Sequence, residues 1–223
     1  TLATGDAAKL GLGTVVFTNV NGTEDLLYAK EMMQSKGLNE DNGPVKFQFQ
    51  HLLSKVKFTF HNGFNTKNAS IKVSNVTMTA PKTATATLTG NWWEANPWAG
   101  HAGALTLAFG DACSKTAAGK FEVAANERLT IPAGAEQKYT VTFDVVLYQG
   151  TVEAYKGTKT VTIENVALEI GKAYNFKAEL NASNIMADGP ELLPIVFDVE
   201  EVKDWVTAET PDTNVQEAEL RAA

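Results

Sequence analysis

The chain has 223 residues, 44% of them apolar and 20% charged, which is the composition of a globular protein that can bury a core. No run approaches the ~20 apolar residues that a membrane-spanning helix needs. The net charge is −7 and the only arginines are Arg128 and Arg221, which argues against nucleic acid as a partner, because phosphate binding needs clustered Lys and Arg.

The first half of the chain predicts short strands that end at Asn, Gly or Pro. Alternating apolar residues mark a strand, because successive side chains on a strand point to opposite faces. In residues 69–78 the alternation slips by one position between Val73 and Val76, and we expect both to face the core. The predicted strands are residues 13–18, 25–30, 46–50, 55–60, 69–78 and 83–88, and residues 31–36 are consistent with a helical turn.

The second half of the chain continues the same pattern. Its longest apolar strand, residues 139–148, ends at the Gln149-Gly150 turn. Many short strands separated by turn residues, with almost no helix, predict an all-β fold of the sandwich type. The predicted strands of this half are residues 105–109, 128–131, 139–148, 159–163, 171–180 and 195–199.

The segment Lys46–Phe60, KFQFQHLLSKVKFTF, changes phase in its middle. Its first half is apolar at odd positions such as Phe47, and its second half is apolar at even positions such as Phe58. A slip of one residue turns a whole apolar face toward water, so residues 51–54 must absorb the change. We expect the chain here either to leave one sheet and enter another or to carry a bulge that re-aims the strand.

Three of the four tryptophans, Trp92, Trp93 and Trp98, lie in the loop Gly90–His101. Flat aromatic faces suit both sugar C–H groups and protein interfaces, which makes the loop a candidate contact for a host protein or glycan receptor. The alternative is that the three rings cap an open end of the sandwich core. Exposure of the rings would separate these interpretations.

The sequence carries no motif that points to catalysis or to a metal site. His51, His61 and His101 fall in no zinc-ligand spacing, and neither a Gly-x-Ser-x-Gly elbow nor a phosphate-binding loop occurs. Residues 39–43 resemble part of a calcium loop but lack its distal glutamate. The single cysteine, Cys113, can form no internal disulfide and has no nearby histidine in sequence. We therefore expect a non-catalytic protein without cofactors.

The segment around the phase change resembles a landmark of the fimbrillin-like family, the type V pilus subunits and surface adhesins of Bacteroidales bacteria. In that family the landmark reads F-x-H-x-L-A/S-K-V-x-F. Residues 25–29 and 168–177 also resemble family motifs, in the family's order, as does the closing pattern v-x-x-W. The landmark residues here are Phe47, Phe49, His51, Leu52, Lys55, Val56 and Phe58.

The resemblance implies a transthyretin-like Greek-key β-sandwich, with the landmark opening the C-terminal of two such domains. It implies that residues 1–44 are a partial or reduced N-terminal β domain and linker, that residues 45–206 are the C-terminal sandwich, and that residues 207–223 are a polar tail. His51 would then mark a corner of the architecture. Because 44 residues are too few for a complete first domain, we expect a processed or partial chain, or a member with a reduced first domain.

The resemblance also implies an exported subunit at the cell surface, in the fimbrium or at the outer membrane. Pilins of this kind lose an N-terminal strand, and the C-terminal strand of a neighbouring subunit fills the groove. The implied partners are therefore other fimbrial subunits, which bind through the unpaired backbone groups of a sheet edge.

Residues 195–199 are the best candidate for the exchanged strand, because their apolar side chains alternate on one face. Residues 207–223 offer few apolar anchors for insertion into a groove. The alternative is that the segment forms the ordinary last strand of the chain's own sandwich. The apolar residues of the candidate strand and its continuation are Ile195, Phe197, Val199, Val202 and Trp205.

Overall fold

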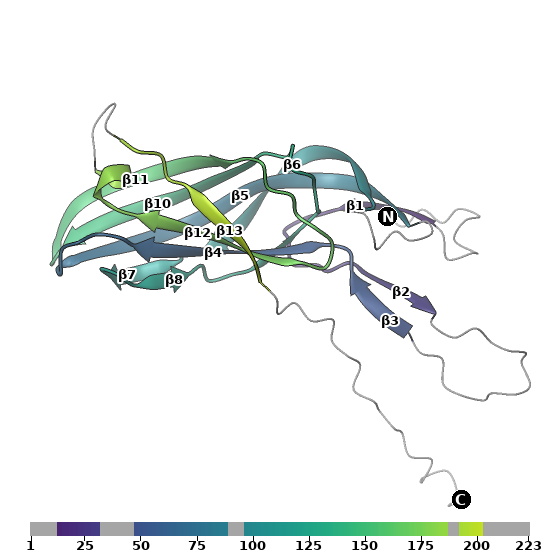
Figure 1. The fold of residues 1–223 in the computed structure, drawn as a ribbon, viewed down its shortest axis with the longest axis horizontal. Helices are drawn as coiled ribbons and strands as arrows, with labels where there is room; N and C mark the ends of the chain where they lie inside the picture. The colour runs from purple at the N-terminus through teal and green to yellow at the C-terminus, as the bar shows by residue number, and fades with distance from the viewer. Residues whose placement is uncertain (1–12, 32–46, 89–95, 187–191, 203–223) are drawn as a thin grey trace, which may run out of the picture.

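The computed structural model describes residues 13–31, 47–88, 96–186 and 192–202, most of which form β-strands (Figure 1). Within these residues no helix is long and apolar enough to cross a membrane. In chain order the elements are β1 (Gly13–Thr18), β2 (Leu27–Glu31), β3 (Phe47–His51), β4 (Ser54–Asn62), β5 (Ala69–Leu88), β6 (Trp98–Gly110), β7 (Cys113–Ala117), β8 (Phe121–Val123), β9 (Arg128–Thr130), β10 (Tyr139–Gln149), β11 (Val152–Ile163), β12 (Ala173–Leu180), α2 (Ala182–Ile185) and β13 (Phe197–Val202).

Two sheets pack against each other in an all-β sandwich, which confirms the predicted fold class (Figure 1). In the six-stranded sheet β5 is central, because β1, β10, β6 and β7 all pair with it and β11 pairs with β10. The five-stranded sheet has the order β13-β12-β4-β8, and β9 also pairs with β4. The β4–β12 pair is parallel and the other pairs are antiparallel. The Greek-key connectivity stays a prediction.

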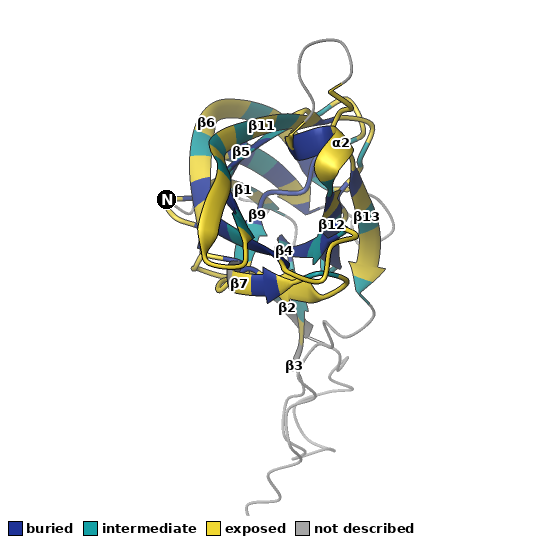
Figure 2. Cartoon of the chain, turned by 90° about the vertical axis from the view of Figure 1, so that its left-hand side faces the viewer, coloured by how far each residue is buried: buried dark blue, intermediate teal, exposed yellow. Residues whose placement is uncertain are grey.

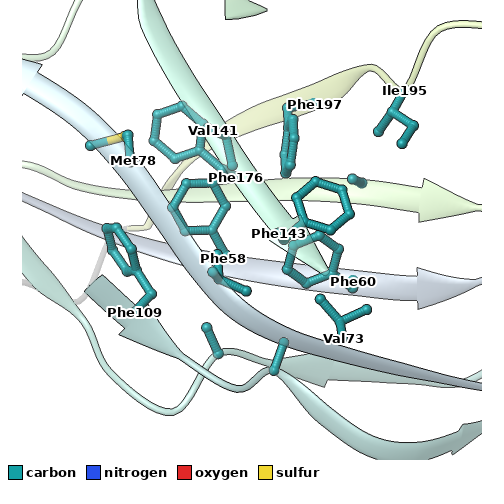
Figure 3. Packing of buried hydrophobic residues seen from close by; sticks show 14 of the residues in the cluster. Phe58, Phe60, Val73, Met78, Phe109, Val141, Phe143, Phe176, Ile195 and Phe197 are labelled. Atoms are coloured by element: carbon teal, nitrogen blue, oxygen red, sulfur yellow. The ribbon is translucent and has the colours of Figure 1, made fainter. Parts of the chain in front are cut away.

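The main core lies between the two sheets and is built largely from phenylalanines (Figure 3). Phe58 on β4 is fully buried, and its ring centroid lies 4.7 Å from that of Phe109 and 5.3 Å from that of Phe176. Phe60, on the same face of β4, lies 4.9 Å from Phe143 of the opposite sheet. Tilted and edge-to-face aromatic pairs add to the free energy gained by burial. These rings therefore join the two sheets.

A second, small core lies beside β1, at the end of the sandwich from which β2 and β3 project (Figure 1). β1 covers it with Val15 and Phe17, which are only half-buried. The smaller core therefore depends on an edge strand for part of its cover. Its buried members are Leu52, Leu53, Ala84, Ala86, Leu88, Trp98 and Ile131.

The slip predicted in residues 69–78 is a bulge in β5 at Asn75. Val73 and Val76 are both fully buried, as the sequence predicts. Asn75 has a φ of 54°, and the β5–β10 register shifts between Thr142 and Asp144. The Asn75 amide Nδ2 donates to Asp144 Oδ2 at 2.8 Å. This hydrogen bond, with a second from Thr158, lowers the pKa of the Asp144 carboxyl.

The phase change at residues 51–54 is a switch between sheets. β3 pairs only with β2, in a separate two-stranded sheet, whereas β4 enters the five-stranded sheet. Leu52 and Leu53, between them, are almost completely buried in the small core. The first of the two alternatives is therefore confirmed. Phe49, which we expected on a buried face, is 47% exposed, because β3 has left the sandwich.

Strand lengths differ from the prediction most clearly in β5. The sequence predicts two strands, residues 69–78 and 83–88, and the structure has one continuous strand of 20 residues. Pro81 interrupts the pattern, and it falls between the part of β5 that pairs with β10 and the part that pairs with β1. A proline, which lacks an N–H, is tolerated where one side of a strand has no partner.

The predicted division of the chain into domains at residue 44 stays a prediction. β1 lies before residue 44, and it pairs with β5 of the sandwich, which lies after it.

Candidate functional site

β13 is the edge strand of the five-stranded sheet. It pairs with Ala173–Ala178 of β12, and no described strand pairs with its other side. The ring of Phe197 lies 5.6 Å from Phe58 and 6.3 Å from Phe143, and both Phe197 and Ile195 are 8% exposed (Figure 3). The row of apolar residues singled out in the sequence thus points into the chain's own main core.

Polar contacts also fasten β13 to β12. Lys172 donates to Glu201 at 2.7 Å, a hydrogen bond that raises the pKa of Lys172, and Lys177 pairs with Glu200. Exposed ion pairs of this kind add at most about 1 kcal/mol each, so burial of the apolar row is the larger contribution. Val199 and Val202 are partly buried, and Trp205 lies outside the described residues.

In this structure β13 is the last described strand and belongs to the chain's own sandwich, which is one of the two alternatives drawn from the sequence. Its role as an exchanged strand stays a prediction. A strand held along one side only can leave without breaking any other pairing in the sheet.

Among the described strands β1 is a second edge strand. It pairs along one side with β5, from Gly13 opposite Leu88 to Thr18 opposite Thr83. Its inward side chains rest on the small core, where the ring of Phe17 lies 6.2 Å from that of Trp98. Its outward side chains are exposed. β1 therefore has the same alternation as β13 but covers a smaller core.

A buried turn, Asn19–Gly22, follows β1 and ties the chain to the body of the sandwich. Asn19 is 2% exposed; its backbone N donates to Lys82 O at 2.8 Å, and its Nδ2 donates to Leu129 O at 2.9 Å. Asn19 Oδ1 accepts from Gly22 N at 2.8 Å. Gly22 has a φ of +73°, and a Cβ there would lie 2.8 Å from Leu107, so only glycine fits. Sequence analysis treated these residues as a simple turn and missed this anchor, because the local sequence does not show that Asn19 is buried against Leu129.

The corner residue His51 links the two-stranded sheet to the sandwich. Its Nδ1 lies 2.6 Å from Asp25 Oδ2, which joins the segment before β2 to the end of β3. Next to it, Leu52 N donates to Leu26 O at 2.9 Å. Lys55, a further landmark residue, pairs with Glu127 at 3.1 Å. These contacts agree with an architectural role for the landmark.

Trp98 belongs to the small core and not to an exposed platform. Its side chain is 5% exposed, and its Nε1 donates to Leu52 O at 2.7 Å. The ring thus fixes the corner at Leu52, as the core alternative for the tryptophan loop requires. Trp92 and Trp93 lie outside the described residues. Nothing in the described part of the chain favours a glycan site at this loop.

The remaining candidates for chemistry have structural surroundings. His61 lies 3.0 Å from Glu179 and stacks on Phe121, and His101 Nε2 lies 2.8 Å from Pro132 O. Among the described residues no group of three or more His, Cys, Asp or Glu could hold a metal ion. Residues 39–43 and the side chain of Cys113 fall outside the description.

Comparison with known proteins decides the family. A family model described as fimbrillin-like matches residues 7–205. The chain belongs to the fimbrillin-like family. No curated protein matches this fimbrillin-like chain in sequence.

Several solved structures are similar to this fimbrillin-like chain. A proposed cell adhesion protein from Bacteroides fragilis NCTC 9343 has 12% identity and a TM-score of 0.40, over 69% of this chain and 46% of that one. A proposed cell adhesion protein from Parabacteroides distasonis ATCC 8503 has 11% identity and a TM-score of 0.45, over 69% and 52%. A fimbrial protein from Bacteroides vulgatus ATCC 8482 has 14% identity and a TM-score of 0.34, over 71% and 56%. The matched region spans about half the length of each.

Proposed function

We propose that this chain is a non-catalytic fimbrial subunit or surface adhesin that is exported and joins other subunits by strand exchange. Membership of the fimbrillin-like family over residues 7–205 supports the fimbrial role. Location at the cell surface, in the fimbrium, follows from that role. The partners are other fimbrial subunits, of the same or a related kind.

The observation that carries the proposal is the position of β1. Departure of this strand would uncover an apolar groove on the small core, lined by Ala84, Ala86 and Trp98. It would also leave the backbone N–H and C=O groups on one side of β5 without partners, and such groups are costly to leave unpaired away from water. A strand with alternating apolar side chains satisfies both needs. The buried anchor at Asn19 confines the departing segment to the residues before it.

The donor is the segment 195–199 of a neighbouring subunit. Phe197 and Val199 have the same two-residue spacing as Val15 and Phe17, so they present a similar row to the groove. Withdrawal of Phe197 from its own core costs about 1.5–3 kcal/mol. Burial of the same ring in the groove of the next subunit offsets that cost.

A disulfide across β1 and β5 tests the proposal. Val16 and Thr85 are direct partners in this antiparallel pair, and such partners lie about 4.5–5.5 Å apart at Cα, within the range that a disulfide spans. V16C/T85C, with Cys113→Ala, would lock β1 in place. We expect surface extract of cells carrying the unlocked chain to give an SDS-resistant ladder on unboiled gels, and extract of cells carrying the locked chain to give none. Either cysteine variant alone should retain the ladder.

Two further locks give a control and a test of the donor. T142C/T160C joins partners on β10 and β11, which take no part in exchange, and should leave the ladder intact. K177C/D198C fixes β13 on β12 and should remove the ladder, because the donor can no longer leave. If the chain with the β1 lock still forms the ladder, the proposal that β1 vacates the acceptor groove is wrong. If the β1 lock removes the ladder but the β13 lock does not, the groove stands and the proposal that residues 195–199 are the donor is wrong.

A further inference from the structure

An exposed apolar surface lies on the two-stranded sheet. This ribbon face consists of Leu27 on β2 and Phe49 on β3, which are 49% and 47% exposed. Leu27 pairs with His51 and Ala29 pairs with Phe49, so Leu27 and Phe49 are diagonal neighbours on one face. A two-stranded sheet is marginally stable in water by itself. A partner that covers the ribbon face would stabilise it.

A second exposed apolar surface, the seam segment, consists of residues 182–186 and 192–194, just before the donor segment. Leu193 N donates to Ser183 O at 2.9 Å, which holds the two pieces together. Ile185 is buried in the main core, whereas α2 also presents exposed residues at this end of the sandwich (Figure 2). The exposed large apolar side chains of the seam segment, between 42% and 58% exposed, are Met186, Leu192 and Leu193.

The two surfaces lie at opposite ends of the sandwich. β4 begins at Ser54, close after the ribbon, and ends at Asn62. β12 runs parallel to β4 and reaches Leu180 beside Asn62, just before α2. The nine residues of β4 make eight steps along the strand and separate the two ends by roughly 26 Å, and Figure 1 shows β2 and β3 far from the α2 end. One copy of the chain therefore cannot bring its ribbon face onto its own seam segment.

We propose that the ribbon face of one subunit docks on the seam segment of a second copy of this chain. The inference rests on the proposed function, because it names the contact that would align subunits for strand exchange. Clusters of exposed large apolar residues mark interaction sites, and here one lies at each end. A contact between two different surfaces is heterologous, so opposite ends produce an open row of subunits and not a two-fold dimer. That geometry is the one a fimbrium needs.

Sedimentation velocity over a concentration series tests the docking separately from strand exchange. The sample is the full chain with the oxidised V16C/T85C lock and Cys113→Ala, which can dock but not exchange β1. We expect Phe49→Glu and Leu193→Lys each to weaken self-association about tenfold or more, as loss of a central apolar anchor does. Val152→Asp is the matched control, because Val152 is 66% exposed on β11, outside both surfaces, and it should leave association unchanged.

Mixing the two variants gives the decisive result. A mixture of Phe49→Glu and Leu193→Lys chains should associate again. The intact ribbon face of the Leu193→Lys chain can dock on the intact seam segment of the Phe49→Glu chain, and the two altered surfaces carry opposite charges. Loss of association in the Phe49→Glu chain with none in the Leu193→Lys chain would mean a two-fold contact between like surfaces and would overturn the proposal. So would a locked chain that stays monomeric at every concentration. The ladder on unboiled gels reports strand exchange independently, so failure of the proposed function is distinguishable from failure of docking.

Discussion

The two cores of this molecule differ in how they are covered. The main core lies between two sheets, and its phenylalanines, such as Phe58 and Phe176, have no exposed surface. The small core is closed in part by β1, whose Phe17 is only half-buried and which pairs along one side. Strand exchange requires a strand that can leave while the rest of the domain stays folded. Departure of β1 would uncover only the small core, whereas the proposed donor segment would withdraw Phe197 from the main core.

Truncation in the main core should have the largest effect on stability. Phe58→Ala removes a fully buried ring that packs with four other phenylalanines, Phe60, Phe109, Phe176 and Phe197. We expect the free energy of unfolding to fall by about 3–5 kcal/mol, measured by urea denaturation with a two-state fit. A loss below about 1 kcal/mol would mean that the main core is not the stable part of the domain.

Removal of the anchor after β1 should have an intermediate effect. Asn19→Ala leaves the part-buried Leu129 carbonyl and the buried Gly22 N–H without their side-chain partner. Unsatisfied buried groups cost about 1–3 kcal/mol, so the free energy of unfolding measured by urea denaturation should fall by that amount. Asn21→Ala, in the same turn but exposed, is the control and should change little. An equal loss in both variants would contradict the anchor.

Truncation under β1 should cost less than truncation in the main core. Phe17→Ala removes a half-buried ring from the small core, and we expect a loss of about 1–2 kcal/mol. Native-state hydrogen exchange should place the effect locally, with faster exchange of β1 amides and unchanged exchange in β10. Faster exchange throughout both strands would show that β1 opens only with the whole domain.

The smallest expected effect concerns pH. Hydrogen bonds from Asn75 and Thr158 lower the pKa of Asp144 in the folded chain, so the stability that they provide is full above the ordinary carboxyl pKa and disappears as pH falls through the lower, folded value. Asp144→Asn should therefore be less stable than the parent chain at neutral pH, with the difference shrinking in acid. A difference in unfolding midpoint that stays constant from pH 7 to strongly acidic pH would contradict the ionised contact at the bulge.

The sequence predicted the strands well where alternation was long. The inward residues of β4 and the slip at Asn75 are where the pattern put them. Alternation identifies the faces of a strand but not what covers them, so it could not show that Phe49 would be exposed. The parallel β4–β12 pair joins segments more than a hundred residues apart, and no local pattern encodes that pairing.

The candidate site was predictable only in part. The apolar row of 195–199 was visible, but the burial of Phe197 against Phe58 depends on a contact across the whole sandwich. The anchor at Asn19 was invisible for the same reason, since its acceptor Leu129 lies 110 residues away. β8 was too short to register as a strand, because three residues carry no measurable alternation.

Cross-linking in the assembled polymer tests strand exchange most directly. The chain would carry Thr85→Cys on β5 and Asp198→Cys on β13, with Cys113→Ala, and heavy- and normal-isotope copies would be mixed before assembly. A short bismaleimide and mass spectrometry would then identify which peptides lie together. Strand exchange predicts cross-links between residue 85 of one isotope and residue 198 of the other. A polymer whose residue 85 never joins residue 198 of another copy would contradict it.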